Sequence, residues 1–216
     1  MYILHLSDIH YRRELGCRKK ADQGPLDGTN KKHGGVDRAA GPDGYQAMLS
    51  AMQNPLVFLD DCLDRVAGDW ERIGLVVITG DLTEDGTAED YRCLKHHIRK
   101  RIGDIPLVVT LGNHDNKRNF REGWLEEDAD SPCGLKEIGS APYNTIRRLE
   151  DTAVISFDTS VQGVPDGRMD DSQAAWLESV LKAEGKGPSI LVTHHHLLPE
   201  QGQIPPLPES RRLLSL

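Results

Sequence analysis

The chain has 216 residues, a length that suits one domain with a hydrophobic core, and its net charge is −8. This acidic excess argues against nucleic acid as a partner, because binding to the phosphate backbone relies on clustered lysines and arginines. No stretch approaches the roughly 18–20 apolar residues that cross a bilayer, so no membrane partner is expected.

Strand-like and helix-like patterns alternate along the chain. Five apolar runs are typical of buried strands, at 2–6, 75–79, 107–111, 153–157 and 189–193. Segments with helical periodicity lie between them, at 55–66, 88–101 and 171–183. Asp171 or Ser172 is expected to cap the last helix. This rhythm predicts an α/β protein with a largely parallel sheet.

Two stretches, 12–50 and 116–142, show neither pattern. No linker divides the chain, so 1–216 is interpreted as one domain with a basic loop insertion at 12–50, which carries eight Lys/Arg against five Asp/Glu. Two interpretations of this insertion stay open. It is either a solvated loop or a segment whose basic side chains attract an anionic substrate, with Arg18, Lys19, Lys20, Lys31 and Lys32 as the candidates.

Four of the apolar runs lead directly into side chains that bind metals or transfer protons. These are Asp8 and His10 after the first run, Asp81 after the second, Asn113, His114 and Asp115 after the third, and His194 after the last. The carboxyl ends of parallel strands form the ligand crevice of an open α/β sheet, so we expect these side chains to converge. Asp8 and His10 are two residues apart, and in an extended segment both would point the same way.

The donor types indicate which metals would suit such a site. Carboxylate and amide oxygens occur together with imidazole nitrogens, and no thiolate accompanies them. This mixed set suits Mn²⁺, Fe²⁺/³⁺ or Zn²⁺ better than Cu⁺ or Ca²⁺.

The order of these motifs resembles the calcineurin-like metallophosphoesterase superfamily. The matching motifs are DxH at 8–10, GD at 80–81, GNHD at 112–115 and the strand-end His194. The segment 167–181, with its Gly-Arg-Met turn and following helix, is similar to the branch of class III cyclic-nucleotide and glycerophosphodiester phosphodiesterases. The resemblance implies a four-layer α/β/β/α sandwich and hydrolysis of a small phosphodiester.

The resemblance also implies a role for each motif residue. Asp8 and His10 would hold one divalent metal ion, Asn113 and His194 a second, and Asp81 would bridge the two. His114 would protonate or stabilise the leaving oxygen, and Asp115 would orient His114 and raise its pKa.

The chain departs from the family pattern in one respect. Members usually carry a Gly-His-x-His segment on a later strand, and no such segment occurs in this sequence. We therefore expect a fragment whose C-terminal strands are missing. Alternatively, the protein is degenerate, or His195, His196 or a partner chain supplies the missing ligands.

Two other functions stay open beside phosphodiester hydrolysis. A catalytically defective member would serve as a binding or scaffold protein, and a DNA exonuclease of the same superfamily also uses GNHD. Assembly into a homo-oligomer also stays open. The four cysteines are scattered without a CxxC pair, which favours reduced thiols and a cytoplasmic location.

Overall fold

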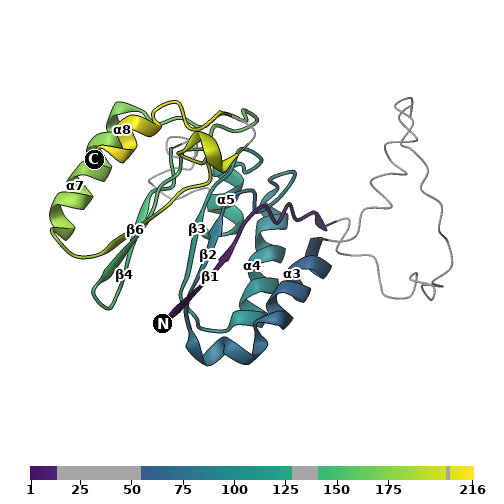
Figure 1. Ribbon diagram of the computed structural model, residues 1–216. Helices are drawn as coiled ribbons and strands as arrows, with labels where there is room; N and C mark the ends of the chain where they lie inside the picture. Colours follow the sequence, from purple (N-terminus) through teal and green to yellow (C-terminus); the bar gives the residue numbers. More distant parts are fainter. Residues whose placement is uncertain (14–54, 128–140, 203–204) are drawn as a thin grey trace, which may run out of the picture.

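The computed structural model describes residues 1–13, 55–127, 141–202 and 205–216, and two three-stranded sheets lie at its centre (Figure 1). The first sheet is parallel throughout and contains, in order, β1 (Tyr2–Leu6), β2 (Ile73–Thr79) and β3 (Leu107–Thr110). The second contains β4 (Thr145–Leu149), β5 (Thr152–Ser156) and β6 (Ser189–Val192). In it, β5 pairs antiparallel with β4 and parallel with β6.

Helices cover the outer face of each sheet. The first sheet packs against α3 (Pro55–Arg65), α4 (Ala88–Ile102) and α5 (Lys117–Gly123), and the second against α7 (Asp171–Glu184) and α8 (Ser210–Leu214). Two 3-10 helices, η2 (Ala67–Arg72) and η3 (Pro199–Gln201), lie in the connections. The layers are therefore α/β/β/α, and the expected sandwich is confirmed.

The central strand β2 accounts for the layer order. Successive side chains of a strand point to opposite faces. Leu75 and Val77 pack against Val154 of β5 in the core between the sheets, whereas Val76 and Ile78 pack in the core beneath the helices. Because both faces of β2 are buried, its sequence is an almost continuous apolar run.

The five predicted strands and three predicted helices are present, with ends within about two residues of those expected. Beyond these elements, the described residues also form β4, α5, α8 and the two 3-10 helices. The expected cap of α7 was wrong by one residue. Asp170 caps this helix, because its side chain accepts from the backbone of Gln173 and the Gln173 side chain accepts in return from the Asp170 backbone.

Most of the basic insertion at 12–50 lies outside the described residues, which resume at Pro55. The expected role of Arg18, Lys19, Lys20, Lys31 and Lys32 therefore stays a prediction.

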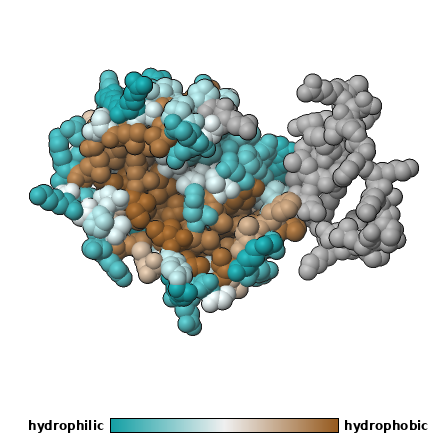
Figure 2. Space-filling model, viewed as in Figure 1, coloured by the Kyte–Doolittle hydropathy of each residue, from teal (hydrophilic) through white to brown (hydrophobic). Residues whose placement is uncertain are grey.

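An apolar groove of about 680 Å³ runs along the edge strands β1 and β6. Ile3 and Val77 line it from the first sheet, and Ile190 and Leu198 from the segment around β6. Figure 2 shows a broad gathering of apolar side chains on this face of the molecule. The groove reaches His194, so it opens beside the strand ends.

The longest helix of the described residues is α4, with 15 residues. A helix needs about 20 apolar residues to span a bilayer. None of the described helices has both the length and the apolar character required.

Candidate functional site

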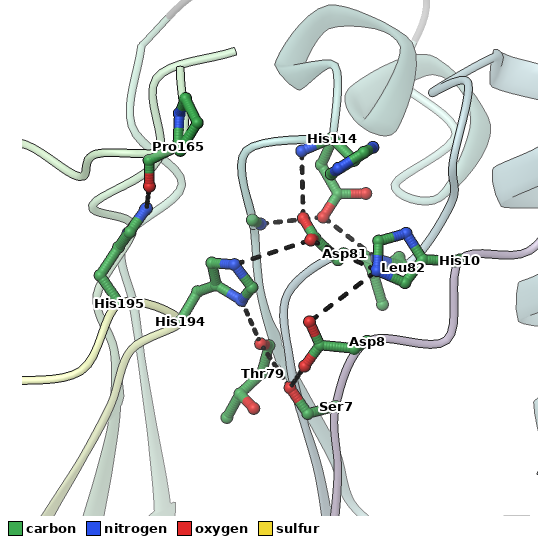
Figure 3. A network of polar contacts seen from close by, with 12 residues as sticks. Ser7, Asp8, His10, Thr79, Asp81, Leu82, His114, Pro165, His194 and His195 are labelled. Atoms are coloured by element: carbon green, nitrogen blue, oxygen red, sulfur yellow. Dashed lines mark hydrogen bonds and ion pairs between the residues drawn. The ribbon is translucent and has the colours of Figure 1, made fainter. Parts of the chain in front are cut away.

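The carboxyl ends of β1, β2 and β6 bring Asp8, Asp81 and His194 together, as predicted (Figure 3). One ligand atom from each of these residues lies within 4.8 Å of the others. A second group, formed in the same way by His10, Asp81 and His114, lies beside the first. Asp81 belongs to both groups, so its carboxylate lies between two sets of potential metal ligands.

Three of these residues have a left-handed backbone conformation. Asp8, His10 and Asp81 have φ of 54°, 49° and 47°, which is unfavourable for residues other than glycine. Hydrogen bonds between the two loops hold this geometry, since Asp8 N donates to the Gly80 carbonyl and His10 N to the Asp81 carbonyl. The expectation that Asp8 and His10 converge through an extended backbone was wrong. Their side chains converge because both residues turn out of the strand direction.

Two glycines make this close approach possible. A Cβ at Gly80, which has φ of +82°, would lie 2.5 Å from Nδ1 of His194. A Cβ at Gly112 would lie 2.1 Å from the Asp81 carboxylate. Side chains at either position would therefore occupy the space that the ligands need.

The distances within the site suit a shared metal environment. Nε2 of His10 lies 3.8 Å from Oδ1 of Asp8 and 3.6 Å from Oδ2 of Asp81. Nε2 of His194 lies 3.8 Å from the same Oδ2 atom. Oxygen and nitrogen donors spaced in this way can contact a common ion after small shifts, because typical metal–ligand bonds are about 2.0–2.2 Å long. The donor set therefore fits divalent metal ions.

The charges of Asp8 and His10 are coupled. Interaction with the His10 imidazole, reinforced by Ser7, lowers the pKa of Asp8 to about 2 despite partial burial. Interaction with Asp8, together with Asp81 and Glu84, raises the pKa of His10 to about 9. In the metal-free protein at neutral pH, His10 therefore carries a proton at the place where a cation would bind.

Adjacent histidines at the end of β6 have different surroundings. Nδ1 of His194 donates to the Thr79 carbonyl at 2.8 Å, which leaves Nε2 facing Asp81. His195 is buried, accepts from the Thr159 hydroxyl and donates to the Pro165 carbonyl. Burial, followed by the neighbouring His194, lowers the pKa of His195. His195 thus ties two loops together and points away from the ligand groups (Figure 3).

The GNHD segment places its residues in three different environments. Asn113 is half-buried, and its backbone carbonyl accepts from Gly163 N. His114 is more open, with 38% of its side chain exposed, and its backbone N–H donates to Oδ1 of Asp81. Its side chain is also close enough to His10 and Asp81 to belong to a ligand group, which the sequence did not predict.

Asp115 does not hold the His114 ring as expected. Its fully buried carboxylate accepts hydrogen bonds from the backbone N–H groups of Leu82, Thr83 and Gly112 and from the Tyr91 hydroxyl. These four donors occupy both oxygens, so Asp115 connects the loop after β2 with the loop after β3. Burial raises its pKa to about 6. The carboxylate that the structure pairs with the His114 ring is Glu84, with Oε2 at 3.6 Å from Nδ1.

Comparisons with known proteins show which proteins this chain is similar to. The family model for calcineurin-like phosphoesterases matches residues 1–214. The glycerophosphodiester phosphodiesterase GpdQ of Enterobacter lignolyticus is 28% identical over 223 residues, covering 100% of this chain and 65% of that protein. A probable cyclic nucleotide phosphodiesterase of Rhodococcus erythropolis is 31% identical over 143 residues, covering 65% of this chain and 44% of that protein.

The 3′,5′-cyclic adenosine monophosphate phosphodiesterase CpdA of Escherichia coli K12 is 28% identical over 139 residues, which cover 63% of this chain and 45% of that protein. The chain thus spans between about two fifths and two thirds of the length of these relatives. The family match, in contrast, covers nearly every residue, and it includes each of the strand ends that meet at the site. The chain belongs to the calcineurin-like phosphoesterase family.

Proposed function

We propose that this protein hydrolyses a small phosphodiester with the help of two divalent metal ions, Mn, Fe or Zn, bound at the strand ends. The observation that carries the proposal is the position of Asp81, whose carboxylate belongs to both ligand groups. One oxygen of Asp81, Oδ2, lies 3.6 Å from Nε2 of His10 and 3.8 Å from Nε2 of His194. The two histidines follow strands of different sheets. A carboxylate placed in this way suits a bridge between two cations.

In this proposal, Asp8 and His10 hold the first ion, Asn113 and His194 hold the second, and Asp81 contacts both. Such a pair, when bound, supplies an acidified water and neutralises charge on the phosphoryl oxygens. The names of two relatives specify a glycerophosphodiester and a cyclic nucleotide as substrates. These names support a small phosphodiester as the substrate, rather than a protein or a nucleic acid.

The chain's own residues orient the site and supply a proton. Hydrogen bonds from Nδ1 of His194 and Nδ1 of His10 leave the Nε2 atom of each ring facing Asp81. His114 lies at the exposed side of the site, where its imidazole can donate a proton to the leaving oxygen. Asp115 holds the GNHD turn and the loop after β2 in register through its four hydrogen bonds.

The test compares Asp81→Asn with the wild type and with Asp104→Asn, an exposed control before β3. Each protein is stripped with chelator and then titrated with Mn²⁺ or Zn²⁺, and turnover of bis(p-nitrophenyl) phosphate is measured. We expect wild type and Asp104→Asn to bind two ions and to turn over the diester, and Asp81→Asn to lose both properties. A folded wild-type protein without metal binding or turnover would overturn the proposal and favour a binding or scaffold role.

A further inference from the structure

Glu84, which the sequence did not single out, lies on the loop that follows β2. This loop is joined to the loop after β1 by a ladder of backbone hydrogen bonds. His10 N donates to Asp81 O at 2.9 Å, Tyr11 N to Leu82 O at 3.1 Å, and Glu84 N to Tyr11 O at 3.1 Å. The ladder continues the parallel pairing of β1 and β2 beyond the sheet. It therefore fixes the backbone of Glu84 relative to that of His10.

The Glu84 carboxylate lies against two imidazoles. Its Oε2 atom is 2.6 Å from Nδ1 of His10 and 3.6 Å from Nδ1 of His114. The two rings meet edge to face, with centroids 4.8 Å apart. One carboxylate oxygen thus contacts rings that come from the loop after β1 and from the loop after β3.

The other oxygen of Glu84 is held from the opposite side. Nη2 of Arg12 donates to Oε1 at 3.1 Å, and Nε of the same guanidinium lies 3.3 Å from Asp85. Arg12 and Glu84 are both largely shielded, with 21% and 28% of their side chains exposed. The carboxylate is therefore fixed at both oxygens, which limits its rotation.

We infer that Glu84 is the positioning residue of this site, aligning His10 for metal binding and His114 for the substrate; the inference rests on the proposed function. Because Glu84 accepts the Nδ1–H of His10, Nε2 is the nitrogen left for a metal ion, and it faces Asp8 and Asp81. Histidine ligands of metals commonly donate their second ring N–H to a carboxylate, which sets the tautomer and strengthens the donor. The contact with His114 couples the metal site to the proton donor.

The rival role for Glu84 is an ordinary surface ion pair with Arg12. Such a pair would contribute little to stability, and its loss would leave the ligand geometry unchanged. The neighbouring Asp85 provides the matched control, because it also contacts Arg12 but is 57% exposed and has no described contact with either histidine. Asp85→Asn should therefore disturb Arg12 without disturbing His10 or His114.

The experiment uses Glu84→Ala, which removes the acceptor, and Glu84→Gln, which keeps a neutral one. Calorimetric titration of the metal-free proteins with Zn²⁺ should show affinity about 10–100-fold lower for Glu84→Ala, a smaller loss for Glu84→Gln, and less than a twofold change for Asp85→Asn. Nitrogen-15 NMR of the metal-free proteins is recorded at a pH above the pKa of His10, where the ring is neutral. It should show Nδ1–H in the wild type and a shift toward Nε2–H in Glu84→Ala.

The inference is overturned if both Glu84 variants keep the wild-type zinc affinity and the wild-type His10 spectrum. If Glu84→Ala does not fold, the zinc affinities of Glu84→Gln and Asp85→Asn are compared. A larger loss of affinity in Glu84→Gln supports the inference, and equal affinities overturn it. If the wild type binds no metal, the proposed function fails. The His10 spectra of the metal-free proteins then still show whether Glu84 sets the tautomer.

Discussion

Nε2 of His194 lies 3.8 Å from Oδ2 of Asp81, although the two residues follow strands of different sheets. Its Nδ1 atom donates to the Thr79 carbonyl at 2.8 Å, so the ring crosses the space between the sheets at their carboxyl ends. The candidate metal site therefore depends on how the two sheets pack, and a bound ion would join them.

Replacing His194 by Ala should reduce the stabilisation that metals confer. A ligand that binds only the folded state at 100 times its Kd adds about 2.7 kcal/mol. We expect the rise in Tm on adding Mn²⁺ to shrink substantially in His194→Ala and to persist in His96→Ala, an exposed residue of α4. Differential scanning calorimetry with and without Mn²⁺ measures both shifts. An unchanged metal-induced shift in His194→Ala would remove this residue from the ligand set.

Gly80→Ala should destabilise the fold through two separate effects. A left-handed backbone costs a residue with a Cβ about 1–2 kcal/mol. The contacts of 2.5 Å with His194 and 2.8 Å with Gly112 N add overpacking of about 1–3 kcal/mol. Gly185→Ala is the control, because it has φ of +68° with no atom within 4 Å of the added Cβ. Urea unfolding should show the larger loss for Gly80→Ala, and equal losses would contradict the steric argument.

Tyr91→Phe should weaken the hydrogen-bond network around Asp115. The buried Tyr91 hydroxyl donates to Oδ1 of Asp115 at 2.9 Å and accepts from Asn116 N at 2.9 Å. Removing it leaves a backbone donor without this acceptor, which costs about 1–3 kcal/mol. The control is Ser179→Ala, which removes an exposed hydroxyl bonded to the Trp176 carbonyl. Comparable urea midpoints for Tyr91→Phe and the wild type would show that this hydrogen bond contributes little.

Metal binding should release a proton from His10. Its pKa is raised from 6.5 to about 9, so the protonated ring stabilises the metal-free fold below pH 6.5, and this contribution is lost as the pH rises through 9. A metal ion requires the neutral ring. Calorimetry in buffers of different ionisation enthalpy should therefore show about one proton released from His10 per protein at pH 7, falling toward zero at pH 10. Proton release from this residue that is independent of pH would disprove the assignment.

His114→Ala distinguishes a proton donor from a metal ligand. If His114 acts on the leaving oxygen, the variant keeps its metal content and loses about 10²–10⁴-fold in kcat. Metal content by mass spectrometry and diester turnover are measured on the same sample. Loss of one ion would instead assign His114 to the ligand group that it forms with His10 and Asp81.

The sequence predicts the strands and helices whose buried residues recur with a regular spacing. The strand β2 and the helix α4 were predicted because their apolar residues face a core. The edge strand β4 was missed because its three central residues are exposed and two of them are arginines. The short helix α5 was missed because its Asn116 cap and buried Phe120 lie in a charged stretch without clear periodicity.

The convergence of Asp8, His10, Asp81 and His194 could be predicted, because each of them follows a predicted strand. Their mutual roles were not predictable. Glu84 and Asp115 are both acidic residues beside ligands, and only the three-dimensional contacts assign Glu84 to the imidazoles and Asp115 to backbone amides. The metal identity, the cytoplasmic location and the oligomeric state stay predictions.

The left-handed backbone at Asp8, His10 and Asp81 has a consequence for stability. Glycine would relax each of these positions by about 1–2 kcal/mol, but it offers no donor atom. The protein thus gives up some stability at positions whose side chains can bind a metal ion. Glycine at any of the three positions would therefore exchange a potential metal ligand for a more favourable backbone.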